Sequence, residues 1–199
     1  ILEKIVALPR KNFSSILTFY YHRTVRAINA GEEDIPKLLS DLDLALSFVK
    51  AKDNNDPFVV YEEMPDTIAH AILRTMGNSM TDYNISLRGL PTTEERKAKQ
   101  CLEQGTKYLG HSCPEMLRNI QELVCQIFFI GSDCPEENCA FSLTSAVTQG
   151  MVFINGEYHP SRVFLLDKYI HEAAHAYLFL INQEELLVLN DPKELYPSP

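Results

Sequence analysis

The sequence predicts an α+β protein, a mostly helical single domain with a few short strands before a metal-binding helix of the zincin type. Three observations support this prediction. Apolar residues recur at helical spacing in the first half, short β-rich segments follow, and a late helical segment contains HEAAH at 171–175. We expect one domain over 1–199, with a helical half to about residue 125 and a metal-site half from about 126 that continues beyond residue 199.

Composition excludes several classes of protein. The 199 residues carry a formal net charge of −9, and the basic residues form no stripe, so nucleic acid is not expected as a partner. No window approaches the roughly 18 apolar residues of a membrane span, and the N-terminus does not have the layout of a secretory signal. The five cysteines are odd in number and form no CxxC pair, which favours reduced, mostly buried thiols in a cytoplasmic protein.

Two helices are expected near the start of the chain. Apolar and aromatic residues recur at three- and four-residue spacing from Asn12 to Ala30, and Gly31 follows as a C-terminal stop. Asp34 can cap the next helix, whose apolar face extends to Val49. The two helices should pack against each other.

The middle of the chain contains shorter elements. PFVVYEE at 57–63 is apolar and β-branched, as in a strand, and a further helix is expected over 66–76. TDYNISLRGLPTT at 81–93 is typical of a loop, and Thr92 offers a cap for the helix that begins with EERKAKQ. That helix is charged on most faces, so we expect it to be solvated.

The segments before the motif should supply the remaining strands. EMLRNIQELVCQIFF, 115–129, is expected to be a helix that runs into an apolar segment. FSLTSAV at 141–147 and GMVFIN at 150–155 are short and β-rich, and Asn155-Gly156 is a strong turn signal.

The motif lies on the segment Arg162–Ile181, which has no internal Gly or Pro and follows Ser161, a residue that can open a helix. Positions i and i+4 lie one turn apart on one helix face, so His171 and His175 can present imidazole nitrogens to one divalent metal ion. Glu172, next to the first histidine, should lie beside that ion. The alternative is a pair of ordinary surface or core histidines.

Two histidines do not complete a metal site, because a working site needs at least one more ligand. The metzincin pattern would require Gly and His where the chain has Leu178 and Ile181, which excludes that subclass. Glu194 lies at about the distance of a gluzincin ligand, but nearby prolines disfavour a helix there. His159 precedes the motif helix and is the other nearby candidate. The third ligand is therefore a remote residue or lies beyond Pro199.

Two stretches, SLTSAVTQGMVFIN and LLDKYIHEAAHAYLFLINQEELLVLNDPKELYPSP, resemble the bacterial HExxH-motif, α-ketoglutarate-dependent peptide β-hydroxylases encoded beside ribosomally made peptide natural products. The resemblance covers roughly Phe141 to Pro199. It implies that His171 and His175 bind Fe(II), that 2-oxoglutarate is the co-substrate, and that a precursor peptide is hydroxylated at a side-chain Cβ. It also implies an arginine- and proline-rich segment after Pro199, followed by a histidine that completes the site.

Two other functions fit the same motif. A zinc metallopeptidase would use Glu172 as the general base, and the strand GMVFIN could then pair with an extended substrate. A non-catalytic peptide- or metal-binding module is the second alternative. In the oxygenase, Glu172 is not needed as a base and would orient a ligand or support the site. All three functions involve a peptide or metal partner, and the sequence does not indicate the oligomeric state.

Overall fold

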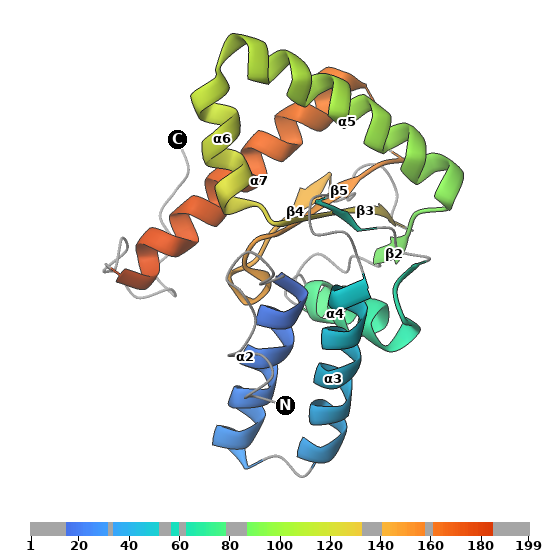
Figure 1. Ribbon diagram of the computed structural model, residues 1–199, viewed down its shortest axis with the longest axis vertical. Helices are drawn as coiled ribbons and strands as arrows, with labels where there is room; N and C mark the ends of the chain where they lie inside the picture. The colour runs from blue at the N-terminus through green and yellow to red at the C-terminus, as the bar shows by residue number, and fades with distance from the viewer. Residues whose placement is uncertain are drawn as a thin grey trace, which may run out of the picture.

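A mixed β-sheet lies at the centre of the protein, with helices on both of its faces (Figure 1). The computed structural model describes residues 15–31, 34–51, 57–59, 63–78, 87–132, 141–157 and 161–184. Helices account for most of these residues, so the prediction of a mostly helical protein with a few short strands is confirmed. Of the helices in this part of the chain, none has the length and apolar content that a bilayer crossing requires.

Five strands form the sheet within the described residues. They are Phe58–Val59 (β1), Leu87–Gly89 (β2), Gln126–Ser132 (β3), Ser142–Leu143 (β4) and Met151–Asn155 (β5). β3 is central: β5 runs parallel to it on one side, and β1 (parallel) and β2 (antiparallel) share its other side. β4 pairs antiparallel with β5 and forms the opposite edge of the sheet.

Side chains of the two central strands alternate between two hydrophobic clusters, one on each face of the sheet. In β3, Phe128 and Ile130 belong to the first cluster, whereas Ile127 and Phe129 belong to the second. β5 alternates in the same way. A strand buried on both faces is a continuous apolar run, which cannot be distinguished from a buried helix by its periodicity. The helix predicted to run into an apolar segment accordingly ends at Leu123, and the apolar segment is β3.

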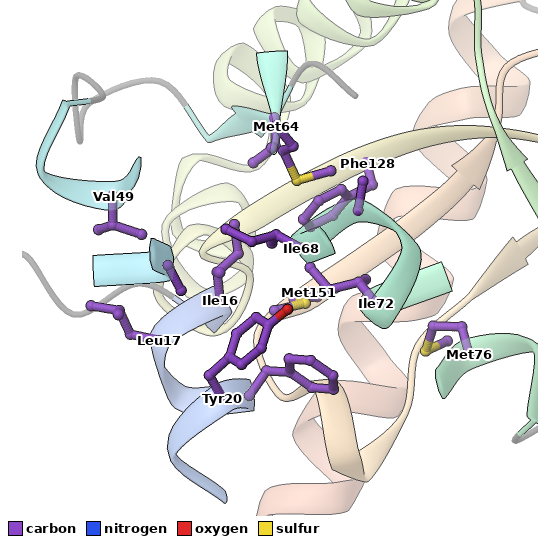
Figure 2. Close-up of a cluster of buried hydrophobic side chains, with 14 of the residues drawn as sticks. Ile16, Leu17, Tyr20, Val49, Met64, Ile68, Ile72, Met76, Phe128 and Met151 are labelled. Carbon is purple, nitrogen blue, oxygen red and sulfur yellow. The ribbon is translucent and has the colours of Figure 1, made fainter. Parts of the chain in front are cut away.

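The first face carries the helices Ser15–Ala30 (α2), Ile35–Ala51 (α3) and Asp66–Asn78 (α4). α2 packs against α3 as predicted, and Gly31 between them has a φ of 69°, which suits a glycine helix stop. Figure 2 shows Tyr20 of α2 among Ile68 and Ile72 of α4. Burial raises the pKa of Tyr20 to about 12, so its ring remains neutral in this cluster.

The second face carries the helices Thr92–Ser112 (α5), Pro114–Leu123 (α6) and Arg162–Glu184 (α7). α5 is exposed on most faces, as predicted, but the prediction missed one buried stripe: Ala98 and Leu102 are fully buried in the cluster that also contains Leu165 of α7. The sequence did not reveal this stripe of small and apolar residues, because charged residues dominate the rest of α5. The prediction for Thr92 was wrong: it is the first residue of α5, and Pro91 occupies the cap position without a side-chain hydrogen bond.

Gly105 lets α5 and α7 approach each other closely. A Cβ added at Gly105 would lie 3.0 Å from the carbonyl oxygen of Arg162 and 3.1 Å from Cβ of Leu166. These neighbours belong to the first turns of α7 and cannot rotate away. Gly110 on the same helix differs, because its added Cβ would meet Leu117 Cδ2, the end of a flexible side chain, at 3.0 Å.

We expect Gly105→Ala to lower the free energy of unfolding by about 1–2 kcal/mol, because overpacking against α7 outweighs the gain in helix propensity. Gly110→Ala is the matched control and should raise the free energy of unfolding by up to about 1 kcal/mol. Urea unfolding followed by circular dichroism measures both changes. A similar gain in stability from both alanines would contradict the close contact between α5 and α7.

Several shorter segments differ from their predictions. β2 lies inside the segment 81–93 that we predicted to be a loop, and the strand predicted over 57–63 is described only as the two residues of β1. The turn after β5 is confirmed, with the Glu157 N–H donating to Asn155 Oδ1 at 3.0 Å.

The cysteines are free where they are described, but they are less buried than predicted. Cys101 is half-buried, whereas Cys113 and Cys125 are exposed, because they lie at the two ends of the short helix α6. Cys134 and Cys139 lie outside the described residues.

Candidate metal centre

α7 holds the motif in a fixed orientation. The helix begins as predicted, with the Phe164 N–H donating to the Ser161 hydroxyl at 3.2 Å, an N-terminal cap. Leu165, Tyr169 and Ala173 are buried in the second cluster. Because these three residues define the inner side of α7, they also fix which residues of HEAAH face outward.

The two motif histidines lie together on the exposed side of α7. His171 Nε2 and His175 Nε2 are 3.0 Å apart, and their ring centroids are separated by 4.6 Å. The ring of Phe179, one turn further along, stacks on His175 with a centroid distance of 6.3 Å. The structure therefore brings the two predicted ligands together, with their Nε2 atoms in contact.

The spacing of the ring nitrogens can be compared with metal coordination. At metal–nitrogen distances of about 2.1 Å, two nitrogens at right angles lie about 3.0 Å apart, and two at the tetrahedral angle lie about 3.4 Å apart. The observed 3.0 Å fits neighbouring positions of a six-coordinate ion, and it is equally the length of a hydrogen bond between the two rings without metal. Such positions are those that two histidines occupy in the facial sites of non-haem Fe(II) enzymes.

Glu172 lies on the inner side of the same helix. Its side chain is only 3% exposed, and none of the described residues makes a hydrogen bond or ion pair with it. Consecutive helix residues differ by about 100° in direction, which separates the carboxylate from the outward-facing histidines. The carboxylate oxygens of Glu172 are not among the buried side-chain atoms of the described residues that lack a hydrogen-bond partner.

The described residues place no third candidate ligand beside the histidine pair. No group of three His, Cys, Asp or Glu side chains in this part of the chain is placed to hold a metal ion. Glu194 and His159, the candidates from the sequence, lie outside the described residues. The other described histidines are exposed on other helices: His22 on α2, His70 on α4 and His111 on α5.

Sequence reasoning did not identify a cavity of about 260 Å³ beside the second half of α7. Its lining comes from five separate parts of the chain: Ser15, Thr18, Glu122, Leu123, Cys125, Thr144, Ser145, Gln149, Gly150, Ala176, Phe179 and Leu180. Gly150 in this lining has a φ of 76°, a backbone conformation that favours glycine. Because Phe179 also stacks on His175, the cavity adjoins the candidate metal centre.

Tyr169 lies on the inner side of α7, one turn before Glu172. Burial, with a smaller contribution from the nearby Cys125, raises the pKa of Tyr169 to about 12. The phenol therefore stays protonated at neutral pH and adds no charge to this side of the helix.

No protein-family model matches the chain, and none of the curated proteins compared with it matches either. The resemblance over residues 141–199 therefore stays a prediction, and the site has to be judged on its own geometry.

Proposed function

We propose that the protein is an Fe(II)- and 2-oxoglutarate-dependent oxygenase that hydroxylates a peptide side chain at Cβ. The observation that carries the proposal is that His171 and His175 lie side by side on the exposed side of α7, with their Nε2 atoms 3.0 Å apart, so that one ion can be bound by both. His171 and His175 would hold the iron, with a third ligand outside the described residues. The resemblance of residues 141–199 to peptide β-hydroxylases supports the choice of co-substrate and substrate.

The overall reaction would consume the peptide, 2-oxoglutarate and O₂ and would release the hydroxylated peptide, succinate and CO₂. When bound, iron and 2-oxoglutarate would supply the activation of O₂ that the side chains alone do not provide. The residues of this chain would position the reactants. The exposed side of α7 leaves the histidine pair accessible to a substrate as large as a peptide, and Phe179 would help to orient the ring of His175.

Glu172 would support the site electrostatically. Its buried carboxylate lies on the same turn as His171, so a cation at the histidines would gain from the nearby negative charge. A zinc peptidase would instead need this carboxylate within hydrogen-bond reach of the attacking water on the open side of the metal. In the HExxH helix of a peptidase the glutamate also follows the first histidine by one residue, so the place of Glu172 on α7 fits both enzymes, and the Glu172→Gln variant distinguishes them.

The proposal can be tested with anaerobically purified full-length protein, Fe(II), 2-oxoglutarate and a panel of candidate precursor peptides. On addition of O₂ we expect succinate and a peptide heavier by one oxygen atom, in equal amounts. Fe(II) replaced by Zn(II) is the control and should give neither product. Peptide cleavage with zinc, without succinate, would overturn the proposal in favour of the peptidase. Peptide binding without either reaction would favour the non-catalytic module.

A further inference from the structure

The strand at the free edge of the sheet is β4, and it is not the strand that the sequence suggested for pairing with a substrate. GMVFIN forms β5, which lies between β3 and β4 and so has no open side. The earlier suggestion that this strand pairs with a substrate is therefore wrong. The open side belongs to β4, because no other strand of the described residues pairs with its outer edge.

The register of β4 shows which of its backbone groups are available. The Asn155 N–H donates to the carbonyl oxygen of Phe141, and Leu143 lies opposite Phe153. In an antiparallel pair, the residues between such bonded positions direct their N–H and C=O groups away from the partner. The backbone of Ser142 therefore points to the outer edge, where an extended peptide can add a strand.

The cavity begins where β4 ends. Thr144 and Ser145, which directly follow the strand, line it together with Ala176 and Phe179 of α7. Ser15 and Ala176 are buried at its base, whereas Glu122, Cys125 and Leu180 are exposed at its rim. At about 260 Å³ it lies below the range of about 300–1,000 Å³ for small-molecule sites, so one side chain of a peptide is a better fit than a whole ligand.

The charge of the lining selects among side chains. Among the described residues that line the cavity, Glu122 is the only charged one, and none is Lys or Arg. An acidic group, 2-oxoglutarate included, would meet this carboxylate without a balancing cation. A basic side chain could place its aliphatic stem against Ala176 and Phe179 and its charged end near Glu122 at the rim.

We propose that the outer edge of β4 and this cavity together form a peptide-binding cleft, in which an extended peptide pairs with Ser142 and a basic side chain enters the cavity. The inference deepens the proposed function, because it rests on a peptide being the substrate. The cleft lies next to the candidate metal centre, because Phe179 lines the cavity and also stacks on His175. A bound peptide would therefore pass beside the histidine pair.

Cys125 at the rim allows a test that does not depend on turnover or on metal. The full-length protein is equilibrated in a thiol buffer with cystamine, with 2-hydroxyethyl disulfide or with dithiodipropionate, which deliver cationic, neutral and anionic groups. In each exchange, the cysteine thiolate displaces one half of the probe disulfide as a thiol and retains the other half. Mass spectrometry of digested protein then reports capture at each cysteine separately. Cys113, which is also exposed but does not line the cavity, is the internal control.

We expect the ratio of cationic to anionic capture to be about tenfold higher at Cys125 than at Cys113, because Glu122 attracts one probe and repels the other. Glu122→Gln should remove this difference, and Glu94→Gln, at an exposed position on α5 outside the cavity, should not. Ala176→Leu should reduce capture of every probe at Cys125 by filling the base. Equal ratios at the two cysteines would overturn the assignment of the cavity to a basic side chain.

Competition with peptides tests the pairing with β4. The capped peptide Val-Thr-Lys-Val-Thr should protect Cys125 from cystamine but should not protect Cys113. The same sequence with Glu in place of Lys, or with alternate backbone nitrogens methylated, should not protect either cysteine. Protection by the methylated peptide would overturn strand pairing. Since hydroxylation is not measured in these experiments, their failure would leave the iron and 2-oxoglutarate proposal standing, and the reverse also holds.

Discussion

Replacing His171 or His175 by alanine should lower the affinity for Fe(II) by at least about 100-fold, because each substitution removes one of the two adjacent ring nitrogens. In the wild-type protein, metal at about 100 times its dissociation constant should add about 2.7 kcal/mol to the free energy of unfolding, and this gain should be absent in both variants. Anaerobic equilibrium dialysis measures the affinity, and thermal unfolding with and without metal measures the gain.

The same substitutions should leave the metal-free protein almost unchanged. Both histidines are exposed, so the expected change in the free energy of unfolding is within about 0.5 kcal/mol. His70→Ala is the matched control, because His70 is also an exposed helical histidine and should affect neither metal affinity nor stability. Undiminished metal binding by the His171 variant would show that the pair is an ordinary pair of surface histidines.

Replacing Glu172 should affect stability and activity in opposite directions. Glu172→Leu places an apolar side chain at a position that is only 3% exposed and should raise the free energy of unfolding by up to about 1 kcal/mol. The exposed Glu103 is the control: Glu103→Leu should change stability by no more than about 0.5 kcal/mol, although Glu103 lies 4.0 Å from Lys99.

The variant Glu172→Gln distinguishes the two enzyme mechanisms. It keeps the shape of the side chain and removes its capacity to accept a proton. In the oxygenase, hydroxylation should fall by less than about tenfold with metal still bound, because no step requires Glu172 as a base. Loss of a general base usually costs about 10² to 10⁴ in rate. A loss of that size with full metal occupancy would therefore assign Glu172 the role of base and support the peptidase.

The parts of the structure that the sequence predicted well are those set by local rules. α2, α3 and α7 follow from helical spacing together with the stop at Gly31 and the cap at Ser161. The proximity of His171 and His175 was also predictable from a local rule. A spacing of four residues on one helix places the two side chains next to each other, whatever the rest of the chain does.

The parts that the sequence did not predict depend on residues far apart in the chain. β3 is apolar on both faces only because helices cover both sides of the sheet. Burial of the stripe on α5 depends on the contact that Gly105 makes with α7, which the charged composition of α5 conceals. The cavity joins Ser15 of α2 to Leu180 of α7, and no local pattern brings those residues together. The inward direction of Glu172 likewise depends on how α7 is docked.

The close contact at Gly105 has a consequence for how the chain can change in length. It fixes α7 at Arg162 and Leu166, and His171 follows a little over one turn later. Insertion of one residue between Leu166 and His171 would turn the histidine pair by about 100° towards the sheet, whereas most substitutions in the same interval would leave its direction unchanged. Variation among related chains should therefore preserve the number of residues in this interval more strictly than their identities.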